Sequence, residues 1–210
     1  MIGWLILIAL FAYFCGSFPA GYLIAKRKGV DIKKEGSGAT GGTNVARILG
    51  WKSAIPTVLI DVFKVWLPVF LAVLIFTGSW PIFPVAVLAM LGHIFPVWLK
   101  FKGGKGITSL VGILLALNFN LFLFYLLAWA VIFVILTVAI KVSRSSFSEK
   151  MAASNLLVVW YLPVLFWFFF GSLGWLIFAV VLIGIIYFAH RENIFRMKEK
   201  FKNTLKNSRD

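Results

Sequence analysis

Residues 53–76 read SAIPTVLIDVFKVWLPVFLAVLIF and contain only two charged side chains, Asp61 and Lys64. A helix needs about 20 mostly apolar residues to cross the hydrocarbon core of a bilayer. The whole chain of 210 residues has the same character, with 61% hydrophobic and 13% charged residues. Soluble domains average about 25% charged residues, so this composition predicts an all-α integral membrane protein. It excludes disordered, collagen-like and disulfide-scaffold classes, and the single cysteine, Cys15, cannot form an intramolecular disulfide.

The remaining apolar segments bring the predicted number of transmembrane helices to seven. The run from Ile107 to Ile140 has 34 residues, too many for one crossing at about 1.5 Å per residue, and Asn118-Phe119-Asn120 is its natural break. The first segment is expected to be a span rather than a cleaved signal peptide, because no basic residue precedes its long apolar stretch. The predicted spans are Ile2–Ala25, Ser53–Phe76, Pro81–Leu99, a short one from Ile107, one from about Leu121 to Ile140, Ala152–Phe170 and Trp175–Ala189.

The distribution of basic residues predicts the orientation. Every Lys and Arg except Lys64 lies in four segments on alternate connections, 26–52, 100–106, 141–150 and 191–210. By the positive-inside rule these segments face the cytoplasm, which places the N-terminus outside and the C-terminus in the cytoplasm. A count of six or eight spans would put some basic residues on the wrong side. The formal net charge of +14 is therefore explained by topology, and no nucleic-acid partner is expected.

Three of these basic segments contain motifs that suggest chemistry. Residues 36–47 read GSGATGGTNVAR and lead into a short helical pattern. A glycine-rich turn before a helix N-terminus exposes backbone N–H groups to an anion, and Arg47 lies one helical turn beyond Asn44. The alternative is a flexible cytoplasmic linker, since such loops are common.

The second motif is Lys102-Gly-Gly-Lys-Gly106, directly before the short fourth span. It lacks the spacing of a Walker A loop, but its glycines allow close backbone approach to a phosphate with Lys105 as a point charge. Lys100 and Lys102 are expected only to enforce topology. The third motif is His190-Arg-Glu-Asn193, in which His190 and Asn193 can face one pocket; the alternative is an interfacial helix end where Arg191 extends to the membrane surface.

Three polar side chains lie inside predicted spans. Asp61 and Lys64 are spaced i, i+3 and are expected to form a structural ion pair near the cytoplasmic end of their span, although such pairs also line cavities. His93 is either a hydrogen-bonded core residue or part of a pocket wall. No metal-ligand cluster, no His-x-x-x-x-Asp dyad and no paired aspartates of a phosphotransferase occur. Chemistry at this protein therefore needs an activated substrate, with catalysis by orientation and charge stabilisation.

Taken together, the motifs resemble the bacterial membrane glycerol-3-phosphate acyltransferase family that uses acyl phosphate (the PlsY family), over about residues 5–197. The matching residues are Gly16-Ser-Phe-Pro19, Tyr22, Asp31-Ile32, Gly36-Ser-Gly38, Thr43-Asn-Val45, Arg47, Gly50, Asp61, Lys64, Pro68, Gly92-His93, Phe95-Pro96, Lys100–Gly106, His190–Ile194 and Arg196.

The resemblance implies a single seven-span domain, 1–197, with a basic cytoplasmic tail, 198–210, in the inner membrane with its active site facing the cytoplasm. It implies acyl transfer from acyl phosphate to the 1-hydroxyl of sn-glycerol 3-phosphate, without metal or cofactor. It also implies the lipid bilayer and the soluble enzyme that supplies acyl phosphate as partners. The implied catalytic residues are Ser37, Arg47, Lys105 and Asn193. The implied substrate-binding residues are Gly36, Gly38, Gly41, Gly42, Thr43, Asn44, Gly103, Gly104, Gly106 and His190.

The sequence departs from the family pattern at a few positions. Ala39 replaces an asparagine of the first loop, and Gly42 stands where alanine is common. Phe147 stands where an Arg-x-x-Ser pattern has its serine, and either Ser146 or Ser148 can take that place. The tail lacks the usual Gly-Thr-Glu ending. Two functions from other classes remain alternatives: a membrane transporter or lipid-anion binder with the same basic pocket, and a seven-span structural subunit.

Overall fold

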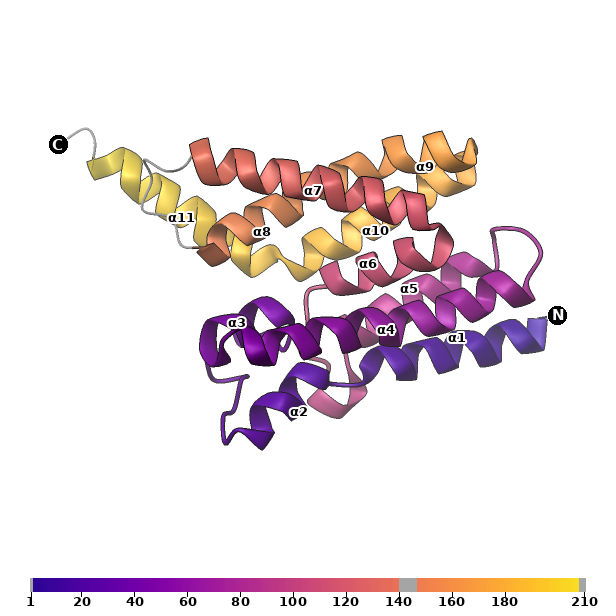
Figure 1. Ribbon diagram of the computed structural model, residues 1–210, viewed down its shortest axis with the longest axis horizontal. Helices are drawn as coiled ribbons and strands as arrows, with labels where there is room; N and C mark the ends of the chain where they lie inside the picture. Colours follow the sequence, from indigo (N-terminus) through magenta and orange to yellow (C-terminus); the bar gives the residue numbers. More distant parts are fainter. Residues whose placement is uncertain (1, 140–146, 208–210) are drawn as a thin grey trace.

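The structure, a computed structural model, describes residues 2–139 and 147–207, and these residues form helices and connecting segments without a β-strand (Figure 1). The helices are α1 (Ile2–Ser17), α2 (Ala20–Arg27), α3 (Gly42–Leu49), α4 (Trp51–Ile75), α5 (Ile82–Ile94), η1 (Val97–Leu99), α6 (Ile107–Leu117), α7 (Phe119–Ala139), α8 (Phe147–Val158), η3 (Val159–Tyr161), α9 (Leu162–Phe170), α10 (Leu173–Ala189) and α11 (Arg191–Asn207). The prediction of an all-α membrane protein is confirmed.

The lengths of the helices decide how many of them qualify as spans. Five helical stretches among the described residues are long and apolar enough to cross a membrane: Ile2–Arg27, Trp51–Ile75, Ile82–Leu99, Phe119–Val138 and Phe147–Phe170. A sixth results if α10 and the start of α11, which meet at 59°, count as one broken span. The remaining apolar helix, α6, has 11 residues and at 1.5 Å per residue reaches about halfway through a bilayer core of about 30 Å. The count of seven spans stays a prediction.

Two local features set where the spans break. Pro19 has no backbone N–H and disfavours helical geometry at the preceding Phe18, so the first predicted span is divided into α1 and α2. The predicted break near Asn118 is confirmed: its side-chain oxygen accepts the backbone N–H groups of Asn120 (2.8 Å) and Leu121 (3.1 Å). This bond caps the start of α7, which therefore begins at Phe119 rather than at Leu121.

Glycines allow α1 and α5 to pack closely. A side chain at Gly16 would overlap the carbonyl of Ala89, and one at Gly92 would overlap the carbonyl of Tyr13. Close backbone approach through small residues is a common way for membrane helices to pack, because lipid offers no hydrophobic driving force between them. The Tyr13 hydroxyl also donates to the carbonyl of Phe95 (2.8 Å), which fixes α1 against the C-terminal end of α5.

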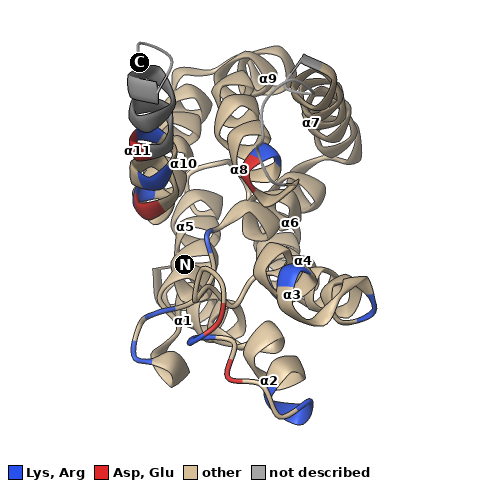
Figure 2. Cartoon of the chain, turned by 90° about the vertical axis from the view of Figure 1, so that its left-hand side faces the viewer, with Lys and Arg blue, Asp and Glu red and all other residues tan. Residues whose placement is uncertain are grey.

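The charged residues gather at one end of the bundle. Figure 2 looks at this end, where Lys and Arg positions, coloured blue, lie on or beside α2, α3, α8 and α11. The start of α1 and the end of α11 lie at opposite ends of the molecule (Figure 1). Residues 140–146 lie outside the described residues. They include Lys141, Arg144 and the first part of the stretch 143–148, in which this sequence departs from the family's Arg-x-x-Ser pattern.

Candidate functional site

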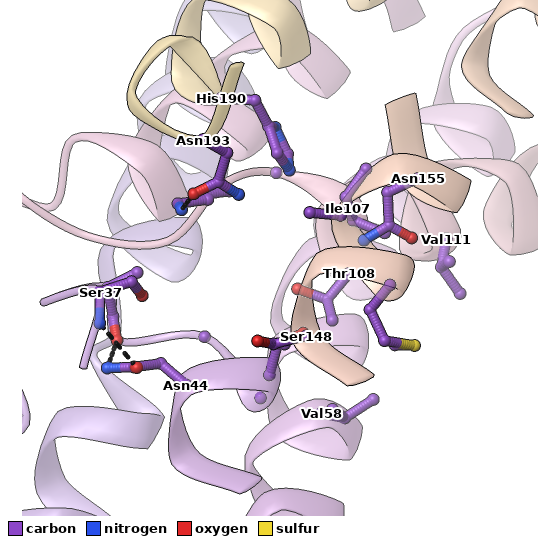
Figure 3. A pocket seen from close by; sticks show the side chains of 18 of the residues that line it. Ser37, Asn44, Val58, Ile107, Thr108, Val111, Ser148, Asn155, His190 and Asn193 are labelled. Atoms are coloured by element: carbon purple, nitrogen blue, oxygen red, sulfur yellow. Dashed lines mark hydrogen bonds between the residues drawn. The ribbon is translucent and has the colours of Figure 1, made fainter. Parts of the chain in front are cut away.

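All three sequence motifs border one cavity at the charged end of the bundle. The cavity measures about 570 Å³. Figure 3 shows side chains from the first loop, α6, α8 and the junction of α10 and α11 facing it. The predicted site residues that line it are Ser37, Gly41, Gly42, Thr43, Asn44, Arg47, Lys105, Gly106, His190 and Asn193. The tertiary structure thus brings together segments that are far apart in sequence.

The other predicted glycines lie behind this lining rather than on it. The backbone N–H of Gly38 donates to the carbonyl of Glu35 (2.9 Å), that of Gly103 to Ile94 (3.0 Å) and that of Gly104 to His93 (3.0 Å). Gly36 lies against Asn44 and Arg47, because a side chain on it would overlap the Asn44 amide oxygen. The backbone N–H groups of Gly38, Gly103 and Gly104 are thus bonded within the protein, so a bound anion would contact other donors.

The Asn44 side chain holds the first loop in shape. Its amide nitrogen lies 3.0 Å from the carbonyls of both Glu35 and Ala39, and its oxygen accepts the N–H of Ser37 (3.0 Å) and Nη1 of Arg47 (3.0 Å). Asn44 is buried, whereas Arg47 is exposed at the cavity mouth. The Asn44 side chain therefore places Ser37 and the Arg47 guanidinium, and because Asn44 also lines the cavity, its contact with substrate stays a prediction.

Two helix N-termini point at the cavity. α3 begins at Gly42 and α6 at Ile107, and both residues line it. The first backbone N–H groups of a helix have no partner one turn earlier, and the helix dipole favours negative charge there. The two loops before these helices are joined by the backbone N–H of Thr40, which donates to the carbonyl of Gly103 (3.4 Å), and Lys33 Nζ donates to the carbonyl of Leu99 (2.9 Å) just ahead of the second loop. This end of the bundle is therefore built to receive an anion.

Lys105 connects the second loop to the third motif. Its Nζ donates to Oδ1 of Asn193 (2.6 Å), as the dashed line beside Asn193 in Figure 3 shows. Burial lowers the pKa of Lys105 to about 8; Glu192 opposes this change, while Arg196 and Arg47 add to it. A cation that is surrounded by other cations and partly desolvated gains most when a phosphate binds, because the phosphate supplies the missing counter-charge.

His190 presents one nitrogen to the cavity region as an acceptor. It is buried, and its Nδ1 lies 2.9 Å from the carbonyl of Ile186. Since a carbonyl only accepts hydrogen bonds, Nδ1 carries the proton and Nε2 of the neutral ring is the acceptor. Burial lowers the pKa of His190 to about 4, with Lys105 contributing and the Ile186 hydrogen bond opposing. A neutral imidazole of this kind can orient a substrate hydroxyl.

The half of the cavity away from the loops is apolar. Val58 and Val62 of α4, Val111 of α6, and Phe122, Leu126 and Trp129 of α7 line it. Its polar residues include Tyr125 of α7 and Asn155 of α8, and the Asn155 oxygen accepts the indole N–H of Trp129 (2.8 Å). Sequence reasoning named none of these residues, because each span is apolar all round and gives no signal for the face that borders a cavity.

Two further residues that the resemblance brought up also belong to the site. Arg196 and Ser148 line the cavity, and of the two serines that could replace the family's serine, Ser148 is the one among the described residues. Phe147 points elsewhere and packs edge-on against Trp51 and Phe133. Gly42 lies against Val58, whose methyl group occupies the space that an alanine side chain would need.

The ion pair predicted within the second span is confirmed. Lys64 Nζ lies 2.7 Å from Asp61 Oδ1, and both side chains are buried. His93 is buried beside this pair and lines the cavity, which confirms it as part of a pocket wall; its Nδ1 lies 3.6 Å from Asp61 Oδ1 and has no hydrogen-bond partner in the described part of the chain. Within residues 2–139 and 147–207, no three His, Cys, Asp or Glu side chains are placed to hold a metal ion.

Fold and site define a class: a helical integral membrane protein with one cavity that joins a cationic mouth to an apolar wall. The family model described as glycerol-3-phosphate acyltransferase matches residues 6–200. The chain is 38% identical to the glycerol-3-phosphate acyltransferase of Prochlorococcus marinus (strain NATL2A), covering 91% of this chain and 93% of that protein. It is 36% identical to the enzyme of that name from Aquifex aeolicus, covering 90% and 93%.

Solved structures agree with the sequence relatives. The crystal structure of PlsY, described as an integral membrane glycerol 3-phosphate acyltransferase in its glycerol 3-phosphate form, matches with a TM-score of 0.80 and 30% identity. The match covers 93% of this chain and 92% of that one. The chain therefore belongs to the glycerol-3-phosphate acyltransferase family.

Proposed function

We propose that this protein transfers an acyl group from acyl phosphate to the 1-hydroxyl of sn-glycerol 3-phosphate, giving lysophosphatidic acid and inorganic phosphate. The observation that carries the proposal is the single cavity in which Lys105, Arg47 and two helix N-termini face an apolar wall. An acyl phosphate needs both surfaces, because its phosphate is anionic and its chain belongs in the membrane. Family membership supports glycerol 3-phosphate as the acceptor.

The reaction needs little chemical assistance from the protein. The acceptor hydroxyl oxygen attacks the acyl carbon, the bond between that carbon and the phosphate oxygen breaks, and inorganic phosphate leaves with the electron pair. The hydroxyl proton goes to a phosphate oxygen of the substrate itself. Acyl phosphate is a mixed anhydride with a good leaving group, so gathering and orienting the two reactants supplies most of the catalysis.

The protein residues then act mainly on charge and position. Two phosphates in one cavity repel each other, and Arg47, Lys105 and the N-termini of α3 and α6 offset this repulsion. Asn193 orients the Lys105 ammonium, with which it shares a 2.6 Å hydrogen bond. His190 Nε2 accepts the hydrogen bond of a glycerol hydroxyl, and Ser37 contacts a phosphate beside Arg47.

The same proposal includes the membrane arrangement. Seven spans, with α6 as a short fourth, place the N-terminus outside and the cavity on the cytoplasmic side of the inner membrane. The gathering of basic side chains at one end and the opposite positions of the two ends of the chain support this orientation (Figures 1 and 2). Residues 1–197 form the catalytic domain and 198–210 a basic tail, and a soluble enzyme delivers acyl phosphate at this surface.

Purified protein with palmitoyl phosphate tests the donor and the acceptor together. We expect phosphate release that depends on glycerol 3-phosphate and forms one lysophosphatidic acid per phosphate. Palmitoyl-CoA and palmitoyl-acyl carrier protein, offered in parallel, show whether other activated donors also give product. Binding of both substrates without phosphate release would favour a transporter or lipid-anion binder, and no stabilisation by either phosphate ligand would favour a structural subunit.

A bulky substitution in the apolar wall of the cavity tests where the acyl chain binds. Replacing Val111 of α6, which lines the cavity, by Trp should reduce turnover of palmitoyl phosphate far more than turnover of acetyl phosphate, because only the long chain needs this wall. Val138→Trp, on the exposed surface of α7, is the matched control. Equal loss with both donors would place the chain elsewhere.

A further inference from the structure

A row of buried polar contacts lies beneath the second loop, in residues that the proposed reaction does not use. The backbone carbonyl of Phe18, at the break between α1 and α2, accepts Nζ of Lys64 (2.7 Å). Lys64 Nζ also contacts Asp61 Oδ1 (2.7 Å), and the same oxygen lies 3.6 Å from Nδ1 of His93. The side chains are 8%, 2% and 3% exposed, so this row crosses the protein interior.

His93 connects the row of buried polar contacts to the second loop through two contacts with Gly104. Its backbone carbonyl accepts the N–H of Gly104 (3.0 Å). Its ring lies directly against the Cα of Gly104, because a side chain at position 104 would overlap imidazole Nε2. Lys105 is the next residue, and its ammonium bonds to Asn193 on the far side. The position of the Lys105 backbone therefore depends on the imidazole beneath its neighbour.

The energetics argue against a purely stabilising role for this row. Removing an Asp and a Lys from water costs several kcal/mol per ion, and their attraction often fails to repay that cost. Ionisable groups within membrane spans are expensive and mark functional positions. A 3.6 Å separation exceeds hydrogen-bond length, so Asp61 acts on His93 by charge and shape rather than by a direct bond.

We propose that Asp61 and His93 form a positioning unit that fixes Gly104 and thereby places the Lys105 ammonium for the substrate phosphate. The inference rests on the proposed function, because it assigns Lys105 to that phosphate. Asp61 and His93 are positioning residues in this scheme. His93 supports the loop with its ring and takes no proton from the hydroxyl.

A double-mutant cycle between His93 and Lys105 tests the dependence. A misplacement of about 1 Å costs up to about 10²-fold in rate, so His93→Ala should lower kcat/KM about 10- to 100-fold. Lys105→Ala should lower it about 10²- to 10³-fold. If His93 acts through Lys105, the double variant is no slower than Lys105→Ala alone. Multiplication of the two losses, which a general packing defect would give, overturns the inference.

A second double-mutant cycle, between Gly104 and His93, tests the contact by a gain of activity, which a variant that merely folds poorly would not give. Gly104→Ala places a methyl group on the imidazole and should displace Lys105, whereas Gly104→Ala with His93→Ala has room for the methyl group and should be faster than Gly104→Ala alone. Gly184→Ala is the matched control, because a methyl group there meets no atom within 4 Å. Failure of His93→Ala to improve Gly104→Ala contradicts the contact.

The pH profile separates positioning from proton transfer. Positioning predicts that His93→Ala raises the KM for glycerol 3-phosphate and leaves the shape of the kcat profile against pH unchanged. Loss of an acidic limb in that profile would make His93 a base and overturn the proposal. If Lys105→Ala itself retains normal activity, the proposed function fails; if Lys105→Ala is impaired but the cycles show independent effects, only the positioning unit fails.

Discussion

The first loop, residues 36–41 leading into α3, and the second loop, residues 102–106 leading into α6, border the same cavity but are held in different ways. The first is organised from within, by the side chain of Asn44, which bonds four groups of its own segment. The second is held from below, where Gly103 and Gly104 donate to carbonyls of α5 and Gly104 packs on His93.

This difference changes the character of the cation that each loop presents. Arg47 lies exposed at the mouth of the cavity, and its guanidinium offers donors in a planar fork. Lys105 is partly buried beside other cations, and its pKa falls to about 8. One loop thus offers a surface charge that can attract an incoming phosphate, and the other offers a partly desolvated charge whose pKa depends on its surroundings.

Removing the two cations should give the largest effects. Arg47→Ala and Lys105→Ala are each expected to lower the rate about 10²- to 10³-fold, by analogy with the loss of one preorganised charge donor. Phosphate release from palmitoyl phosphate measures the change. Lys100→Ala is the control, since Lys100 is exposed next to the second loop and outside the cavity lining. Near-normal turnover in either site variant would contradict the proposed phosphate cradle.

Breaking the internal organisation of the first loop should rank second. Asn44→Ala removes the partners of Ser37 N–H and of the Arg47 guanidinium, and is expected to lower the rate about 10- to 100-fold by misplacing both. Asn44→Asp keeps the acceptor but loses the two donors to the loop carbonyls, so it should retain more activity than Asn44→Ala. The ratio of the two rates measures the acceptor role, and equal losses would argue against it.

A pair of glycines separates backbone strain from side-chain contact. Gly36 and Gly29 have positive φ values of 58° and 75°, where any other residue costs about 1–2 kcal/mol. Gly36→Ala also meets Asn44 and Arg47, whereas Gly29→Ala meets nothing within 4 Å. We expect both variants to lower thermal stability in detergent and only Gly36→Ala to lower kcat/KM, by about tenfold. A loss of kcat/KM in Gly29→Ala would show that strain alone accounts for the effect.

The pH dependence should show the smallest effect and belongs to the second loop alone. The charged form of Lys105 is present below its pKa of about 8 and is lost as the pH rises through that value. The profile of kcat/KM, which reports the free enzyme, should therefore fall on the basic side near pH 8. In Lys105→Arg, with a charge that does not titrate, this limb should disappear even though absolute activity is lower. An unchanged limb would assign it to another group.

Sequence reasoning located the three motifs because each has a local signature. Glycine runs, a lysine between glycines and a His-x-x-Asn spacing can be recognised within a few residues. The roles within the motifs were less predictable. Asn44, which is predicted to contact the substrate, also braces its loop, and four predicted glycines lie outside the cavity lining. These outcomes depend on which backbone groups the folded loop already satisfies, and a sequence pattern does not record that.

By itself, the sequence determined that the chain is a helical membrane protein and which connections carry its charge, because the energy of burying residues in lipid depends on composition and length alone. Only the tertiary structure decided that Lys105 meets Asn193, 88 residues away, and that His93 supports Gly104 beside Asp61. It also decided which faces of the apolar helices α4, α6 and α7 line the cavity. Such contacts depend on how the helices pack against one another, and packing joins residues whose local sequences carry no trace of their partners.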